Sequence, residues 1–332
     1  MQEKTKIAVL GGGSWATALV KILSENKAEV RWWLRNTEDV QHLQQFGHNP
    51  RYISGVKFDL NYVLPSNNIQ ATIQEADWVI VAVPAAFIQQ ALSLLSAEAF
   101  QGKTLVSAVK GMIPGQNVLI TDFLKNHFGV PAEHQCVIAG PCHAEEVALE
   151  KQSYLTIGSH DIDRAEAFCQ LLRNRYVKAN PLDDIDGVEY CAVLKNIIAL
   201  ACGIAHGLNY GDNFQAVMVS NAMEEIERFL HAIMPLPRKL TGSAYLGDLL
   251  VTAYSQFSRN RTFGNMIGRG YTVKSAQFEM NMVAEGYYAV QSIHELNKRL
   301  NVEMPIVSAV YRILYEGVGP GVEIDILKDQ FK

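Results

Sequence analysis

The chain has 332 residues, beyond the roughly 250–300 at which single hydrophobic cores stop growing, so we expect two domains. With 48% hydrophobic and 19% charged residues, its composition excludes extended disorder. A formal net charge of −5 gives no general attraction to nucleic acid or to anionic membranes, and neither partner is expected.

Short apolar runs rich in β-branched residues recur up to about residue 182 and predict strands. Stretches of helical period lie between them, an alternation typical of a parallel sheet covered by helices. We therefore predict an α/β fold in which residues 1–183 form a Rossmann-like, doubly wound dinucleotide-binding domain. The predicted strands are KIAVLG (6–11), EVRWWLR (29–35), DWVIVAVP (77–84), KTLVSAVKG (103–111), QCVIAGP (135–141) and YLTIG (154–158).

The first predicted strand leads directly into a glycine-rich segment, GGGSWA. Gly11, Gly13 and Ala16 occupy the three small positions of the dinucleotide-binding fingerprint, which permit a tight turn and a close approach to a pyrophosphate. The helix that follows would direct the positive end of its dipole at the phosphates. A glycine-rich turn without a ligand is the alternative, but the strand before it and the amphipathic helix after it favour a nucleotide site.

Arg35 and Asn36 lie at the end of the second predicted strand, where an NAD-specific enzyme usually carries an acid for the ribose 2′-hydroxyl. An arginine there suits a 2′-phosphate. The alternative is a solvated arginine on the surface. We therefore expect NADP(H), NAD(H) or both as the cofactor, with Arg35 favouring NADP(H).

After residue 183 the strand pattern stops, and long helical runs follow at about 188–208, 213–233, 246–256 and 272–300. Proline, glycine and three aspartates between residues 181 and 187 interrupt both the strand pattern and the helical pattern. We therefore predict an all-α substrate and catalytic domain over residues 184–332.

The run over residues 191–208 is apolar or small on nearly every face, which predicts a helix buried on most sides. Lys195 interrupts it. A buried ammonium is costly unless it is paired, and burial lowers the pKa of lysine toward values useful for acid–base chemistry. A lysine that reaches solvent from a core helix is the alternative.

A polar, cationic segment, Ser258 to Arg261, follows a helical stretch in which Asp248 and Thr252 share a face. Arginines around an asparagine suit a phosphate, which they would hold by charge-assisted hydrogen bonds. The alternative is a solvated helix end.

The cysteines and the N-terminus indicate a cytoplasmic protein. The five cysteines show neither CxxC spacing nor a disulfide pattern, as is typical of reduced thiols. The apolar run at residues 7–10 is too short for a signal peptide or a membrane span. Histidines and cysteines lack metal-ligand spacing, so no metal is expected.

These segments together resemble the bacterial-type NAD(P)-dependent glycerol-3-phosphate dehydrogenases. The resemblance implies a soluble dimer that reduces dihydroxyacetone phosphate to sn-glycerol 3-phosphate for phospholipid synthesis. It spans nearly the whole chain and is carried, in order, by GGGSWATA, VAVP, SAVKG, AGPCHAEE, VLKNIIALACGIAHGL, GDLLVTAYSQFSRNRTFG and VAEGYYAV.

The resemblance also implies residue roles, each at a matching motif position. Lys195 would be the proton donor and acceptor, and Lys110 and Asp248 would complete the catalytic group. Besides Gly11 and Gly13, the cofactor would contact Ser14, Trp15, Arg35, Lys110, Ala144, Arg259, Val283 and Glu285. The substrate would contact Lys110, Gly140, Cys142, Lys195, Asp248, Ser258, Arg259 and Asn260.

Two other readings share the same two-domain plan. A hydroxyacid dehydrogenase is one, because a Rossmann domain followed by helices does not fix the substrate. A dinucleotide-binding regulator without catalytic activity is the other. Lys195 and the segment from Ser258 to Arg261 argue against the first reading, and the presence of Lys195 and Asp248 argues against the second.

Overall fold

A computed structural model describes residues 5–280 and 284–331 of the chain. The chain divides into two compact units. The sheet unit comprises Met1–Val109 and Ile120–Asp186, and the helical unit comprises Lys110–Leu119 and Gly187–Lys332. The short segment Lys110–Leu119 therefore belongs with the helices, although the sheet unit precedes and follows it in the sequence.

The sheet unit is built on one eight-stranded sheet with the order β3-β2-β1-β4-β5-β6-β7-β8. Every neighbouring pair is parallel except β6 and β7, which are antiparallel. This confirms the predicted Rossmann-like α/β fold. The strands are β1 (Lys6–Leu10), β2 (Glu29–Trp33), β3 (Val63–Ser66), β4 (Trp78–Val81), β5 (Thr104–Ser107), β6 (Gln135–Ala139), β7 (Ser153–Gly158) and β8 (Val177–Leu182).

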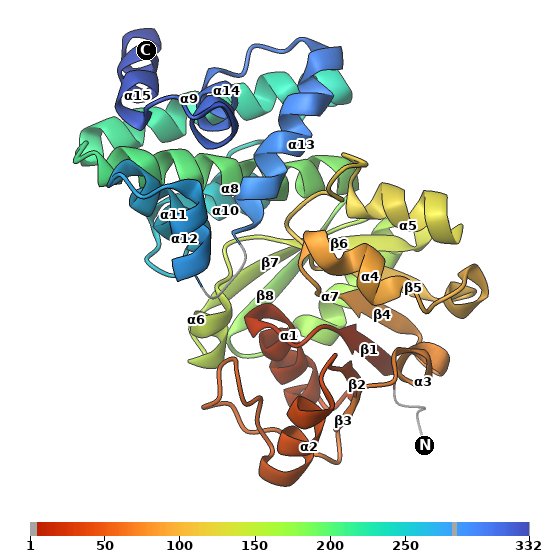
Figure 1. Cartoon of the computed structure of the whole chain (residues 1–332). Helices are drawn as coiled ribbons and strands as arrows, with labels where there is room; N and C mark the ends of the chain where they lie inside the picture. Colours follow the sequence, from red (N-terminus) through yellow and green to blue (C-terminus); the bar gives the residue numbers. More distant parts are fainter. Residues whose placement is uncertain (1–4, 281–283, 332) are drawn as a thin grey trace. The chain divides into compact units, whose positions relative to one another are not determined.

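The sheet reverses its direction of growth beside β1. The chain proceeds from β1 outward to β3 and then returns to β4 on the other side of β1 (Figure 1). Open α/β sheets bind ligands beyond the carboxyl ends of the strands at such a reversal. The glycine-rich segment directly follows β1 and therefore lies at this position.

Helices cover the sheet because their apolar positions recur at helical spacing. The first of them, α1, buries Ala16, Leu19 and Leu23 against a core that also contains Trp32 and Phe168. The helices of this unit are α1 (Ser14–Glu25), α2 (Thr37–Phe46), α3 (Ile69–Gln74), α4 (Ile88–Leu92), α5 (Ile120–Phe128), α6 (Ala144–Ala148) and α7 (Ile162–Leu172), with short 3₁₀ turns η1 (Ala85–Phe87), η2 (Ala97–Phe100) and η3 (Ala132–His134).

Two strands, β3 and β8, were not among those predicted. Both lie at edges of the sheet, and each contains a proline, Pro65 or Pro181. Edge strands tolerate proline because one side of the strand needs no hydrogen-bond donors. In both strands buried residues are interspersed with exposed or half-buried ones, so the sequence lacks the continuous apolar run that marks the most buried strands.

The described part of the helical unit contains helices and no long strand, as predicted for the C-terminal half. The predicted run at 272–300 is divided: α12 ends where Met280 adopts an extended conformation (φ −82°, ψ 110°), and α13 begins at Glu285. The helices are α8 (Ile185–Gly207), α9 (Asp212–Ile233), α10 (Asp248–Tyr254), α11 (Arg259–Gly268), α12 (Val273–Glu279), α13 (Glu285–Leu300), α14 (Pro305–Tyr311) and α15 (Pro320–Gln330), with π-helical turns η4 (Ser243–Gly247) and η5 (Arg312–Glu316).

The central helix α8 begins at the boundary of the two units and continues through the helical unit (Figure 1). Among the described residues it is the one helix long and apolar enough to cross a membrane, but 94% of its most apolar window is buried inside the protein. Burial of this kind is typical of a core helix.

Glycines bring the backbones of α8 and α11 into close contact. A β-carbon added to Gly203 of α8 would lie 2.2 Å from a backbone oxygen of α11, and one added to Gly264 of α11 would lie 2.2 Å from the carbonyl oxygen of Leu200. The same contact recurs one turn later at Gly207 and Gly268. Only residues without a side chain permit this approach, which holds the start of α11 near α8.

Candidate active site

Lys195 and Asp248 form an ion pair inside the helical unit. Lys195 lies on α8, and Asp248 is the first residue of α10. The Nζ atom of Lys195 donates a hydrogen bond to Oδ1 of Asp248, and the two side chains are only 4% and 1% exposed. Lys195 therefore does not reach solvent, and its cost of burial is offset by a charged partner.

Burial has a large effect on the acidity of Lys195. Removal from water disfavours the charged ammonium and lowers the pKa of Lys195 from its ordinary 10.5 to about 7, although the Asp248 carboxylate acts in the opposite direction. The positive charge of Lys110 lowers this pKa further. Both protonation states of Lys195 are therefore accessible near neutral pH, as a general acid and base requires.

Lys110 lies on the other side of the same carboxylate. Its Nζ atom is 3.8 Å from Oδ2 of Asp248, while Lys195 binds Oδ1. The side-chain amide of Asn196 donates a 2.7 Å hydrogen bond to the carbonyl oxygen of Lys110. The structure therefore brings Lys110, Lys195 and Asp248 together, and Asn196 anchors the segment that carries Lys110 to α8.

The start of α11 carries the predicted phosphate-binding residues. Ser258 caps the helix, its Oγ accepting a hydrogen bond from the backbone N–H of Arg261 at 3.3 Å. Ser258 and Asn260 are buried and Arg259 is exposed, so the segment is not simply a solvated helix end. Side-chain donors and the positive end of the helix dipole together suit an anion.

The orientation of Asn260 is fixed by the first turn of α13. Its Oδ1 accepts a 2.9 Å hydrogen bond from the backbone N–H of Gly286. Because the oxygen is used in this way, the amide nitrogen points in the other direction as a donor. Glu285, another predicted cofactor contact, immediately precedes Gly286 at the start of α13. Val283, also predicted to contact the cofactor, lies outside the described residues.

Gly286 was not recognised from the sequence. A β-carbon at this position would lie 2.6 Å from the backbone oxygen of Asn196, so any side chain would push α13 away from α8. Tyr315 stabilises the same turn, since its hydroxyl donates a 2.7 Å hydrogen bond to the carbonyl oxygen of Tyr287. Glycine has a low helix propensity, so its presence in a helix was the one feature of the sequence that could have pointed to a close packing contact at this position.

The glycine-rich segment of the sheet unit fits a pyrophosphate. Gly11 has φ +128°, and a β-carbon there would lie 2.5 Å from the carbonyl oxygen of Ala82, so only glycine is tolerated. Gly13 precedes α1, and apart from its two chain neighbours no atom of the described residues lies within 4 Å of the position its β-carbon would occupy. Ser14 and Trp15 begin α1 beside this open space. Backbone N–H groups at a helix start with room in front of them bind phosphates well.

The loop after β6 carries three further predicted residues at the carboxyl edge of the sheet. Gly140 has φ +112°, and a β-carbon there would lie 2.5 Å from the carbonyl oxygen of Tyr154. Cys142 is buried, and Ala144 begins α6, which packs against α1. Since β1 and β6 point the same way in the sheet, this loop and the glycine-rich segment lie at the same edge.

Asn49 is a second residue that sequence analysis missed. It lies in the loop between α2 and β3, is almost fully buried and donates a 3.0 Å hydrogen bond to the carbonyl oxygen of Gly12. The only sequence signal was its place before a proline, which marks a loop but not its partner.

Comparison with known proteins identifies the family of the chain. Residues 6–165 match the model described as NAD-dependent glycerol-3-phosphate dehydrogenase N-terminus, and residues 184–325 match the corresponding C-terminus. The chain is 33% identical to the NAD(P)+ glycerol-3-phosphate dehydrogenase of Staphylococcus carnosus and 35% identical to that of Staphylococcus aureus, each over 317 residues and 95% of both chains. It is also similar to the crystal structure of glycerol-3-phosphate dehydrogenase from Coxiella burnetii, with a TM-score of 0.91, 29% identity and 98% of both chains covered.

Proposed function

Because the chain belongs to the NAD-dependent glycerol-3-phosphate dehydrogenase family, we propose that it interconverts dihydroxyacetone phosphate and sn-glycerol 3-phosphate with NADP(H) or NAD(H). Its class is that of an NAD(P)-dependent oxidoreductase. The buried pair of Lys195 and Asp248 supports the proposal most directly, because Lys195 has a pKa suited to proton transfer.

A bound nicotinamide cofactor would supply the hydride that reduction of the ketone requires. Lys195 gives a proton to the ketone oxygen as negative charge develops there and is left as a neutral amine, which must regain a proton before the next turnover. Asp248 orients the Nζ atom of Lys195, and Lys110 adds a second positive charge near the developing alkoxide. In the oxidative direction the neutral amine of Lys195 accepts the hydroxyl proton.

The substrate phosphate would be held at the start of α11. Arg259 supplies a charged fork, Asn260 supplies an amide donor, and Ser258 supplies a hydroxyl at the helix start. The family resemblance also implies that Gly140 and Cys142 contact the substrate. Fixing the phosphate restricts where the ketone carbon lies, which favours hydride transfer by positioning.

We assign dinucleotide binding to residues 1–183, and substrate binding and catalysis to residues 184–332. Lys110 is the exception, because we also assign it to substrate binding and catalysis. The glycine-rich segment supports the first assignment, because its helix start and open space suit the pyrophosphate. The proposed cofactor contacts are Gly11, Gly13, Ser14, Trp15, Arg35, Lys110, Ala144, Arg259, Val283 and Glu285.

The cellular role follows from the family resemblance. We propose that the protein acts in the cytoplasm as a homodimer and supplies sn-glycerol 3-phosphate for phospholipid synthesis. Small molecules are its only proposed ligands, with neither nucleic acid nor a membrane as partner.

The proposal is tested by mixing the purified protein with dihydroxyacetone phosphate and following the absorbance of NADPH and NADH separately. Oxidation of either cofactor, dependent on the substrate and absent with a 2-oxo acid, is expected. Turnover of a 2-oxo acid instead would identify a hydroxyacid dehydrogenase. Cofactor binding without any turnover would identify a regulator.

A further inference from the structure

The loop between α2 and β3 is fixed to the glycine-rich segment by Asn49. The side-chain nitrogen of Asn49 donates to the carbonyl oxygen of Gly12 at 3.0 Å and to Oγ1 of Thr17 at 2.9 Å. Its oxygen accepts hydrogen bonds from the backbone N–H groups of Arg51 at 2.9 Å and Tyr52 at 3.2 Å. One buried amide therefore sets the position of Arg51 relative to the segment expected to bind the pyrophosphate.

The side chain of Arg51 extends to the start of α2. Its Nε atom donates a 2.9 Å hydrogen bond to Oδ1 of Asp39, and the side-chain nitrogen of Asn36 donates to Oδ2 of the same carboxylate at 3.2 Å. Asn36 adjoins Arg35 and precedes the first residue of α2. Arg51, Asp39 and Asn36 are therefore connected at the carboxyl end of β2, where dinucleotide-binding folds hold the adenosine ribose.

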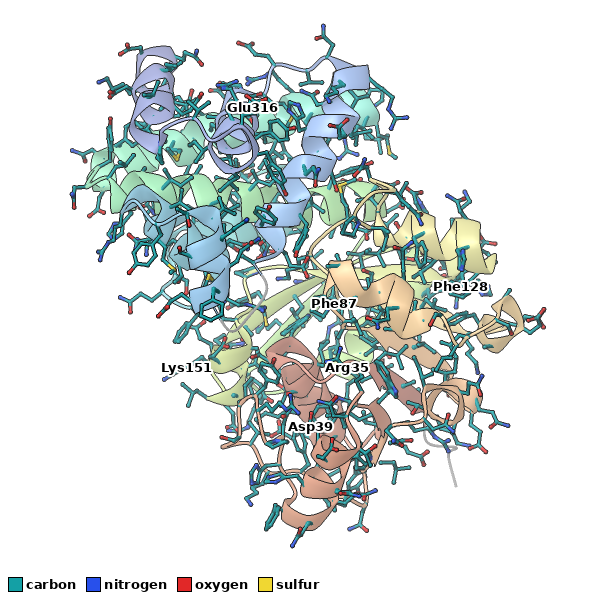
Figure 2. The ribbon with its side chains drawn as sticks, viewed as in Figure 1. Arg35, Asp39, Phe87, Phe128, Lys151 and Glu316 are labelled. Atoms are coloured by element: carbon teal, nitrogen blue, oxygen red, sulfur yellow. The ribbon has the colours of Figure 1, made fainter. Side chains whose placement is uncertain are left out.

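A phosphate can bind at this position only if Arg51 offsets the negative charge of the nearby carboxylates. Glu38 and Asp39, in the first turn of α2, carry two negative charges, whereas Arg35 alone brings one positive charge. Figure 2 shows the side chains of Arg35 and Asp39 within the sheet unit. Without Arg51 the local charge is negative, and a ribose 2′-phosphate, itself a dianion, would be repelled.

Arg51 is also available to a ligand. Its side chain is 54% exposed, while that of Asp39 is only 15% exposed. Within residues 5–280 and 284–331, the Asp39 contact is the one side-chain hydrogen bond or ion pair of Arg51, and it uses Nε alone. The two terminal nitrogens of the guanidinium therefore retain their donors, which match phosphate oxygens in geometry.

We propose that Arg51 is a second determinant of cofactor preference, which neutralises Asp39 and joins Arg35 in binding the 2′-phosphate of NADP(H). The proposal rests on the proposed function, because it requires the adenosine ribose to lie at the end of β2. It assigns a specificity role to a residue outside the glycine-rich fingerprint and outside the strand end that normally sets this preference.

The test compares kcat/KM for NADPH and NADH, with dihydroxyacetone phosphate saturating, in the wild type, Arg51→Gln, Asp39→Asn and the double variant. Arg51→Gln is expected to lower kcat/KM for NADPH about tenfold, the effect of losing about 1.4 kcal/mol, and to change that for NADH less than about twofold. Asp39→Asn added to Arg51→Gln removes the uncompensated carboxylate and is expected to restore most of the NADPH activity.

Lys57→Gln is the matched control. It removes an exposed cation from the same loop, and the Nζ atom of Lys57 donates a hydrogen bond to the carbonyl oxygen of Phe46, away from Asp39. It should leave the ratio of the two cofactors unchanged. Equal losses with NADPH and NADH in Arg51→Gln, or no recovery in the double variant, would overturn the proposal.

Binding of adenosine 2′,5′-bisphosphate and of adenosine 5′-monophosphate, measured by calorimetry, separates this proposal from the proposed function. Arg51→Gln should weaken only the first ligand, whether or not the protein reduces dihydroxyacetone phosphate. Equal affinities of wild type and variant for the bisphosphate would reject the role of Arg51 even in an active enzyme.

Discussion

The Nζ atom of Lys195 and the carboxylate of Asp248 are hydrogen-bonded partners in the interior of the helical unit, and Lys110 approaches the second oxygen of the same carboxylate at 3.8 Å. One buried carboxylate therefore interacts with two ammonium groups. Removing Asp248 or Lys110 changes the charge beside Lys195 and therefore its pKa, so both substitutions should alter the pH dependence of the reaction.

Replacement of Lys195 by methionine should lower kcat by about 10²–10⁴-fold, the usual contribution of a positioned general acid. Methionine fills similar space but cannot donate a proton. The affinity for NADPH, measured by fluorescence titration, should stay within about twofold, since the proposed pyrophosphate site lies in the sheet unit. An unchanged kcat would show that Lys195 takes no part in proton transfer. Lys125→Met, which alters an exposed lysine, is the control, and an equal loss of kcat in it would mean that the effect is not specific to Lys195.

The lowered pKa of Lys195 predicts opposite pH profiles for the two directions of the reaction. Reduction needs the ammonium, so kcat/KM for dihydroxyacetone phosphate should fall as the pH rises through about 7. Oxidation needs the neutral amine, so kcat/KM for sn-glycerol 3-phosphate should rise through the same range. Asp248→Asn removes the carboxylate that raises this pKa, and the midpoint of the oxidative profile should move to lower pH. Profiles that run parallel in both directions would contradict the assignment.

The central strands and the fingerprint were predictable because their signals are local. The strands β1, β4, β5 and β6 are mostly buried runs, and Gly11 and Gly13 follow β1 within a few residues. The edge strands β3 and β8 were missed because partial exposure and proline remove that signal. The predicted strand at 103–111 was too long, because the chain leaves the sheet after Ser107 and Lys110 joins the helical unit.

The residues that position the site were not predictable, because their partners are distant in sequence. Asn49 binds the carbonyl oxygen of Gly12, 37 positions away, and Gly286 binds the side chain of Asn260, 26 positions away. Each is a contact between a backbone group and a polar side chain, which leaves no period or motif in one sequence. Lys195, by contrast, was visible as a charge inside an apolar helix.

Asn260→Asp should raise KM for dihydroxyacetone phosphate by about tenfold or more, because a carboxylate oxygen would replace the amide donor facing the phosphate. The contact with Gly286 should persist, since the other carboxylate oxygen can still accept its N–H. The melting temperature should therefore change little, and KM for the cofactor should change less than KM for the substrate. Asn221→Asp on α9 adds the same charge elsewhere in the helical unit. If it raises KM equally, the effect is one of overall charge and Asn260 does not contact the phosphate.

Two glycine-to-alanine substitutions, one in the contact between α8 and α11 and one in α15, should change the free energy of unfolding in opposite directions. At Gly264 the new β-carbon would meet a backbone oxygen of α8 at 2.2 Å, and backbone atoms cannot rotate away as a side chain would. Gly264→Ala should therefore lower the free energy of unfolding by at least about 2 kcal/mol and should raise KM for dihydroxyacetone phosphate, because α11 carries the residues proposed to bind phosphate. At Gly321, in α15, no atom lies within 4 Å of the β-carbon position. Gly321→Ala should instead raise the free energy of unfolding by about 0.5 kcal/mol, since alanine loses less conformational entropy in a helix. Urea denaturation of the two variants measures both effects, and a Gly264→Ala protein as stable as the wild type would mean that the two helices can separate without cost.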